Sequence, residues 1–170
     1  MEALFYVKDC TIKEFEEGDL QSTLRVYEQV EDFLALGPVP KASMRMVLAD
    51  LKHSTESGKR FCLIIDSKGN KIGVLDFVPE TTKGTAFLSL LMISQDCRRK
   101  GIGRAVVIGL ERFLSQRYQT QMIQSGVQVN NEPGIAFWRA CGFEIEMKAK
   151  AVGDGTVAYD MKKILRNDGI

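Results

Sequence analysis

Four basic residues and two glycines lie within seven positions near the middle of the chain, between Arg98 and Arg104. An apolar, strand-like run precedes them and a helix-like pattern follows. A helix start offers unpaired backbone N–H groups and partial positive charge to an anion. Gly101 and Gly103 have no side chain to keep a phosphate away from those groups. The sequence therefore predicts a pyrophosphate-binding loop, and the alternative is a glycine turn with a solvated basic face.

Two common phosphate-binding patterns do not fit this loop. The Walker loop G-x-x-x-x-G-K-[ST] is absent from the chain. The dinucleotide pattern G-x-G-x-x-G would need a glycine where Val106 stands, and it belongs at the first strand of a chain. What the segment does fit is [RQ]-x-x-G-x-[GA], through Arg98, Gly101 and Gly103 after an apolar strand.

A second segment downstream carries a related pattern. Asn131, Gly142 and Phe143 fit N-x-x-A-x-x-x-Y-x-x-x-G-F, whereas Gly134 and Trp138 stand in place of the alanine and the tyrosine. In order and distance, the two segments together resemble the acetyl-CoA motifs of the GNAT superfamily of N-acetyltransferases. The resemblance extends over nearly the whole chain, from about position 4 to position 164.

The resemblance implies one acetyl-CoA-binding N-acetyltransferase domain over residues 1–170. Its expected fold is a single α/β domain with a mixed, mostly antiparallel sheet of about seven strands flanked by about four helices. Three of the motif residues also have simpler readings: Asn131 as a turn or helix cap, Gly142 as a helix C-cap and Trp138 as a packing residue. The residues that the resemblance assigns to the cofactor are Met92, Ile93, Arg98, Arg99, Lys100, Gly101, Ile102, Gly103, Arg104, Asn131, Phe137 and Trp138.

The family chemistry that this resemblance implies is direct attack of a neutral amine on the acetyl thioester. The backbone N–H of Ile93, in a splayed central strand, is the candidate to stabilise the carbonyl oxygen. In many relatives the tyrosine aligned with Trp138 protonates the departing thiolate, which an indole N–H cannot do. A thiol pKa of about 8.5 makes the thiolate an acceptable leaving group. Either another group or solvent supplies the proton, or the protein has weak or no transferase activity.

The substrate ammonium must also lose a proton, to a carboxylate or through a water relay. We favour Asp76 as the catalytic base, in a strand expected beside the apolar central strand; its alternative is a solvated or structural carboxylate. Glu31 and Asp32, in the helix expected to cover the acceptor site, are rivals that could instead bind a cationic substrate. The weaker candidates are Ser89, His53 and Cys97, the last of which lacks a companion histidine.

Apolar periodicity predicts the elements that position these residues. Ser43 is the expected cap of one helix, and Gly153 to Gly155 form a hairpin turn signal. Leu4–Lys8 and Thr11–Phe15 are expected to form one opening strand with a turn or bulge around Asp9. The other expected strands are Phe61–Ile65, Lys71–Val78, Thr85–Ser94, Met122–Val129, Phe143–Ala151 and Val157–Ile164. The expected helices are Leu20–Leu36, Met44–Lys52, Gly101–Tyr118 and Pro133–Ala140.

Composition limits the function classes. The chain has 170 residues and a net charge of +1, so no global field favours nucleic acid or a membrane surface. Four scattered cysteines and one histidine form no zinc pattern, so we expect no metal. No secretion signal or membrane-length apolar run is present, which predicts a cytoplasmic protein. A homodimer is reasonable, because such folds expose sheet edges.

Three readings remain open at this stage. The first is an acetyl-CoA-dependent N-acetyltransferase acting on a small-molecule or peptide amine. The second, motivated by Trp138, is a catalytically idle CoA-binding sensor or interaction module. The third is an unrelated phosphate-binding domain that holds a nucleotide at Gly101–Gly103.

Overall fold

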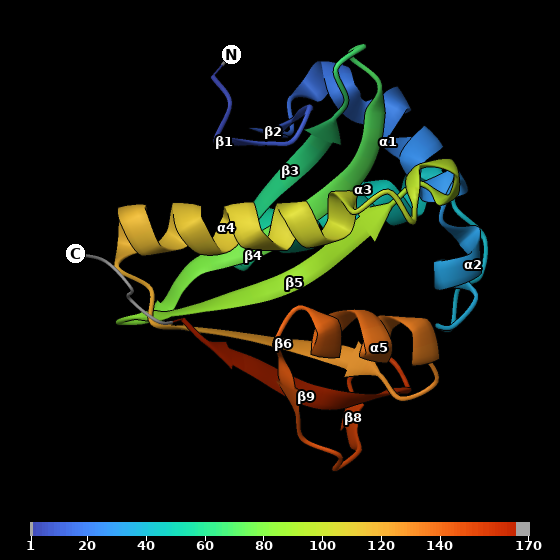
Figure 1. Cartoon of the computed structure of the whole chain (residues 1–170). Coiled ribbons are helices and arrows are strands. Elements are labelled where there is room, and N and C mark those ends of the chain that lie inside the picture. The colour runs from blue at the N-terminus through green and yellow to red at the C-terminus, as the bar shows by residue number, and fades with distance from the viewer. Residues whose placement is uncertain (1, 166–170) are drawn as a thin grey trace.

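One continuous sheet organises the computed structural model, which describes residues 2–165 (Figure 1). Its order is β1-β2-β3-β4-β5-β6-β9-β7, and β8 pairs with β9 outside this path. The strands are β1 (Phe5–Val7), β2 (Cys10–Glu14), β3 (Arg60–Ile65), β4 (Lys71–Thr82), β5 (Thr85–Ile93), β6 (Met122–Gln128), β7 (Glu144–Ile145), β8 (Lys150–Val152) and β9 (Thr156–Ile164). The helices are α1 (Leu20–Glu28), α2 (Glu31–Leu34), α3 (Met44–Glu56), α4 (Ile102–Tyr118) and α5 (Glu132–Ala140), with 3-10 turns η1 (Glu17–Asp19) and η2 (Gln95–Cys97).

The strands pair antiparallel except for β5 and β6, which are parallel. Helix α4 connects these two strands, as a parallel pair requires a crossover. The fold is therefore a single α/β domain with a mixed, mostly antiparallel sheet, which confirms the expected class. Within residues 2–165 the sheet has nine strands and five α-helices lie around it, more than the expected seven and four.

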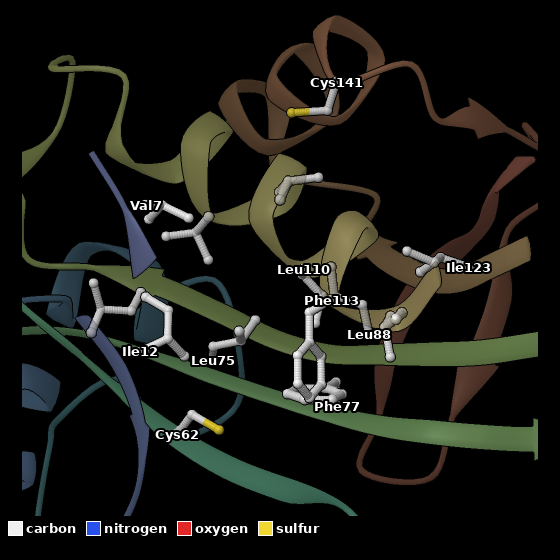
Figure 2. Close-up of a cluster of buried hydrophobic side chains, with 14 of the residues drawn as sticks. Val7, Ile12, Cys62, Leu75, Phe77, Leu88, Leu110, Phe113, Ile123 and Cys141 are labelled. Carbon is white, nitrogen blue, oxygen red and sulfur yellow. The ribbon is translucent and has the colours of Figure 1, made fainter. Parts of the chain in front are cut away.

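Alternating side chains along the strands feed two cores on opposite faces of the sheet. Leu75 and Phe77 of β4 pack beneath α4, where Figure 2 shows Leu110 and Phe113 lying over the sheet. Val74, beside Leu75 in sequence, faces α1 and α3 instead. Both faces of the central strands are thus covered, which accounts for their nearly continuous apolar sequence.

Two predicted elements are wrong in extent. The expected helix Leu20–Leu36 is interrupted at Gln29 and Val30, where the Gln29 carbonyl accepts a hydrogen bond from the Gln95 N–H (3.1 Å). The expected strand Phe143–Ala151 forms only the short β7 and β8. The expected opening strand is instead two paired strands, β1 and β2. The other predicted strands and helices are confirmed within a few residues, including Ser43 as the cap of α3, whose hydroxyl accepts from the Met46 N–H (3.2 Å).

The part of the chain that the structure describes contains no helix with the length and apolarity needed to cross a membrane.

Candidate functional site

Strands β5 and β6 pair over only part of their length. The parallel ladder joins Thr85–Leu88 of β5 to Met122–Ser125 of β6 and then ends. Beyond it, β5 continues beside β4 to Ile93, while β6 continues beside β9 to Gln128. In Figure 1 the two strands start at a common end and move apart, and α2 lies near the end where they are farthest apart. We call this feature the divergence of β5 and β6.

The last residues of β5 present backbone groups to this divergence. The Ser94 N–H bonds the Ile72 carbonyl on the β4 side (2.7 Å). Because successive residues of a strand direct their N–H and C=O groups to opposite sides, the peptide groups of Ile93 point away from β4. The Ile93 carbonyl accordingly accepts a hydrogen bond from Arg98 Nε (2.9 Å). The Ile93 N–H, the predicted oxyanion donor, therefore points to the open side of β5.

The glycine loop, residues 98–104, follows β5 after the short 3-10 turn η2. Gly101 caps α4 with φ +78°, a left-handed conformation that glycine adopts without strain. Gly103 lies in the first turn of α4, where an added Cβ would be 3.2 Å from the Phe137 ring and 3.9 Å from Ile93. The end of β5, the start of α4 and a ring of α5 thus meet at one point. Both glycines occupy positions that a larger residue would fill.

Basic side chains surround this loop from two parts of the chain. Arg99, Lys100 and Arg104 are exposed, and they form no ion pair within residues 2–165. Lys8, in the β1–β2 turn, adds a further cation: its Nζ donates to the Lys100 carbonyl (3.1 Å) and lies 2.8 Å from the position of a Cβ on Gly101. Sequence spacing gave no signal for Lys8, because it approaches the loop only through the packing of the first hairpin.

Arg98 lies differently from its neighbours. Its guanidinium pairs with both carboxylate oxygens of Asp32, the NH2–Oδ1 distance being 3.0 Å. The hydrogen bond from Arg98 is the main cause that holds the pKa of Asp32 below its ordinary value. The structure therefore joins a predicted cofactor residue to a predicted substrate residue. Glu31 also binds within the protein, accepting from the Ala42 N–H (3.2 Å).

The second motif segment forms the start of α5 and its packing. Asn131 caps this helix by accepting a hydrogen bond from the Gly134 N–H (3.0 Å). A Cβ on Gly134 would lie 2.3 Å from the Asn131 side-chain nitrogen, so the glycine leaves room for the folded-over amide. Trp138 is buried in the core, with ring centroids 4.8 Å from Phe137 and 5.2 Å from Phe143. These contacts give Asn131 a capping role and Trp138 a packing role.

Asp76 is buried between β4 and α3. It is 5% exposed, and its Oδ1 accepts a hydrogen bond from the Ser54 hydroxyl (2.8 Å). Burial raises its pKa from 3.8 to about 6, against the opposing effects of the Ser54 hydrogen bond and of Lys59. Desolvation of a carboxylate acts in this direction because it disfavours the charged form. The carboxyl can therefore exchange a proton close to neutral pH.

A polar cluster surrounds Asp76 on the α3 face. Asp50, one helical turn before Ser54, accepts from the Tyr27 hydroxyl (2.7 Å), and burial raises its pKa. Lys59 Nζ donates to the hydroxyl of Ser89 (2.9 Å), which lies where the β4–β5 register shifts. Asp50 and Ser54 lie four residues apart on α3, a helical spacing of polar residues that could have predicted this cluster from the sequence. The sequence analysis did not identify it.

Two of the weaker candidates, His53 and Cys97, remain to be placed. His53 is exposed on the last turn of α3, and Cys97 is a free, partly buried thiol in η2. No group of three or more His, Cys, Asp or Glu side chains within residues 2–165 could hold a metal ion. Two surface grooves are also present. One lies over β6 and β9 and reaches Phe87 and Ser125 of the parallel ladder, and the other lies between β1 and α4 beside Ile108.

The open mixed sheet, its diverging central strands and the glycine loop at the start of α4 define an acetyltransferase fold. The chain belongs to the acetyltransferase (GNAT) family, whose sequence pattern matches residues 24–143. This confirms the resemblance and argues against an unrelated nucleotide-binding domain. Among curated protein sequences, no match to the chain was found.

Solved structures show the same fold at low sequence identity. A Salmonella typhimurium acetyl transferase that modifies the N-terminal serine of ribosomal protein L7/L12 has a TM-score of 0.79 at 14% identity, covering 97% of this chain and 100% of its own. An acetyltransferase from Thermus thermophilus has a TM-score of 0.74 at 23% identity, with 95% and 100% coverage. A spermidine N-acetyltransferase from Vibrio cholerae, solved with CoA and spermine, has a TM-score of 0.69 at 18% identity, with 92% and 95% coverage.

Proposed function

We propose that this protein is an N-acetyltransferase that moves the acetyl group of acetyl-CoA to a primary amine of a small molecule or peptide. The observation that carries the proposal is the divergence of β5 and β6. After Leu88 the backbone edge of β5 has left the β6 ladder, and it leads directly to the glycine loop at the start of α4. Backbone N–H and C=O groups need partners, and an extended ligand with amide groups would supply them there.

The residues at the loop fit a CoA pyrophosphate. Gly101 and Gly103 keep the start of α4 open at positions that a Cβ would crowd, and Arg99, Lys100 and Arg104 add positive charge. Phosphate groups bind at helix N-termini through backbone N–H groups and the helix dipole. Acetyl-CoA, once bound, supplies an activated acetyl thioester. Under this proposal Met92 and Ile93 flank the thioester, and residues 1–170 form one catalytic domain.

Two groups of the chain would act on the reacting atoms. The Ile93 N–H would donate to the carbonyl oxygen as negative charge develops on it. Asp76 would receive, through water, the proton that the acceptor ammonium loses, because burial raises the pKa of its carboxyl to about 6. Trp138 transfers no proton, so the CoA thiolate would leave unprotonated, and the second proton of the attacking nitrogen would pass to solvent or, through solvent, to the thiolate.

The acceptor is proposed to be a primary amine on the strength of the related structures. One neighbour was solved with spermine and another modifies a protein N-terminus. Glu31 stays our candidate for contact with a cationic acceptor, because it lies on the four-residue helix beside the open end of the divergence. Free cysteines throughout the described chain support a reducing, cytoplasmic location. A homodimer also stays a proposal.

A second candidate function is a catalytically idle CoA-binding module. The observation that favours it is Trp138, a buried packing residue where many relatives have a tyrosine. The two functions share the cofactor site and differ only in turnover, so release of free CoA thiol in the presence of amines separates them.

Thermal stability with and without ligands tests the shared cofactor site. Acetyl-CoA should raise the melting temperature much more than ATP or NAD, because a ligand stabilises the folded state to which it binds. Gly103→Leu should abolish the acetyl-CoA shift, since the added side chain would run into Phe137. Gly18→Leu is the matched control, because no atom lies within 4 Å of its Cβ position. Equal shifts with all three ligands, or an unaltered shift in Gly103→Leu, would contradict the assignment.

A further inference from the structure

The Arg98 guanidinium binds acceptors within the protein, whereas Arg99, Lys100 and Arg104 form no ion pair within residues 2–165. Nε of Arg98 donates to the Ile93 carbonyl (2.9 Å), and NH1 and NH2 both donate to the Asp32 carboxylate. A two-pronged arginine–carboxylate pair of this kind fixes orientation as well as distance. Three of the five guanidinium N–H groups are thus used within the protein, which leaves one on each terminal nitrogen.

The partner of Arg98 belongs to a segment that spans the open end of the divergence. We call residues 29–37 the bridging segment. At its beginning, the Gln29 carbonyl accepts from the Gln95 N–H (3.1 Å), on the β5 side. At its end, the Leu36 carbonyl accepts from Asn130 Nδ2 (3.1 Å), and a Cβ on Gly37 would lie 3.6 Å from Gln128 Nε2, on the β6 side. The bridging segment therefore contacts both diverging arms.

Other contacts hold this segment as well: Val30 is fully buried, and Glu31 accepts from the Ala42 N–H (3.2 Å) and pairs with Lys41. The helix of this segment, α2, has only four residues, none of them fully buried, and an isolated helix of this length is not stable in water. Phe33 and Leu34 are only partly buried against the α1–α3 core. The Arg98–Asp32 pair lies midway between the two backbone ties and is the charged contact from α2 to the phosphate loop. The pair is thus the contact that ties the middle of the bridging segment to the end of β5.

We propose that Arg98 is a positioning residue that ties the bridging segment to the end of β5, and not a pyrophosphate ligand. Through Nε it holds the Ile93 peptide, and through NH1 and NH2 it holds the segment beside which the acceptor would enter. This inference rests on the proposed N-acetyltransferase function and revises the sequence-based assignments of Arg98 to the cofactor and of Asp32 to the substrate. Arg99, Lys100, Arg104 and Lys8 are then the cations left for the phosphates.

The test compares Asp32→Ala and Arg98→Ala with Arg99→Ala, a neighbouring arginine of the same loop. Asp32→Ala and Arg98→Ala should raise the KM of the acceptor amine on the order of tenfold or more, since a misplaced wall of an active site costs rate and binding steeply. Their dissociation constant for CoA should change less than about threefold, within the coupling of exposed ion pairs. Arg99→Ala should show the opposite pattern, with weaker CoA binding and an unchanged acceptor KM.

Two further measurements make the outcome decisive. The swapped pair Asp32→Arg/Arg98→Asp should recover part of the acceptor KM lost in the single variants, because contacting residues are energetically coupled. Backbone amides of residues 31–37 should exchange hydrogen faster in Asp32→Ala and Arg98→Ala than in wild type or Arg99→Ala, and this readout needs no activity. If Arg98→Ala weakens CoA binding as much as Arg99→Ala, or if exchange in residues 31–37 is unchanged, the positioning role is wrong. A complete lack of acetyl transfer with faster exchange in those two variants would instead refute only the proposed function.

Discussion

At the scale of single residues, the site combines a carboxyl and an indole whose surroundings decide what they can do. Asp76 has its pKa raised to about 6 by burial beneath α3, with Lys59, Asp50 and His53 as the charged or titratable groups that act on it. Trp138 is enclosed by Phe137 and Phe143. Burial therefore allows Asp76 to exchange a proton near neutral pH. Trp138 has a role in packing.

Replacing Asp76 by asparagine should separate stability from activity. Between pH 3.8 and about 6 the folded carboxyl holds a proton that the unfolded one has lost, so wild-type stability falls as pH rises through this window and stays lower above it. Asp76→Asn removes the ionisation and should raise the free energy of unfolding at pH 8 by up to about 3 kcal/mol, with little gain near pH 4. Denaturant titrations at both pH values measure this. Glu80→Gln, an exposed carboxylate of β4, should show no such gain.

The same substitution tests Asp76 as the base. We expect kcat/KM of Asp76→Asn to fall by a factor of about 10²–10⁴, with loss of the acidic limb near pH 6. Ser54→Ala should move that limb to higher pH, because the hydroxyl stabilises the ionised carboxylate. Thr55→Ala is the control, since its hydroxyl bonds the Leu51 carbonyl on the exposed side of α3. A pH profile unchanged in Asp76→Asn would remove Asp76 from the mechanism.

Replacing Trp138 by phenylalanine should affect packing more than turnover. The smaller ring leaves a partial void between Phe137 and Phe143, at a cost of about 1–2 kcal/mol. Since the indole transfers no proton, kcat should stay within about threefold of wild type. Melting temperature and steady-state rates on the same samples check both parts. A hundredfold loss of kcat without loss of stability would show that the indole takes part in catalysis.

At the scale of elements, helix α4 packs against the first strand, β1, and also begins at the glycine loop. An added Cβ on Gly109 would lie 2.2 Å from Val7 Cγ1 and 3.0 Å from the Phe5 ring, so β1 packs directly on the helix backbone. This close approach also brings the β1–β2 turn, and with it Lys8, next to the glycine loop. The glycine in the middle of α4 therefore serves packing and not flexibility.

Gly109→Ala should destabilise the protein although alanine favours helices. The gain in helix propensity, about 1 kcal/mol, is opposed by overpacking against Val7, which typically costs about 1–3 kcal/mol. We expect a net loss of stability, together with weaker CoA binding as the hairpin that carries Lys8 shifts. Gly126→Ala on β6 is the comparison, because its nearest contact would be an ordinary 3.6 Å to the Tyr159 carbonyl. A Gly109→Ala protein as stable as Gly126→Ala would refute the tight β1–α4 contact.

At the scale of the whole molecule, the sheet consists of two parts held together by a short parallel ladder. Strands β1 to β5 form one part and β6, β7, β8 and β9 the other, with pairing between them only at Thr85–Leu88 and Met122–Ser125. The bridging segment joins the two parts again at the open end. A ligand between the diverging strands would contact both parts, which explains how one small domain could hold a long cofactor.

The sequence predicted those features of this architecture that depend on local pattern. Gly101 and Gly103 marked the start of α4, and the apolar run before them marked a strand covered on both faces. It could not predict the break at Val30, where Gln29 bonds Gln95, because tertiary contacts can override a continuous helical pattern. Nor could it predict Lys8 beside the loop or Asp32 on Arg98, since these contacts join residues 92 and 66 positions apart.

The most direct test of acetyl transfer is release of free CoA thiol from acetyl-CoA across a panel of amines: polyamines, aminoglycosides, amino acids and peptides. We predict release above the rate of hydrolysis with at least one primary amine. That release should be lost in Gly103→Leu and retained in Gly18→Leu. No release above hydrolysis with any amine, from a protein whose melting temperature acetyl-CoA raises, would contradict the enzymatic function and leave a CoA-binding module.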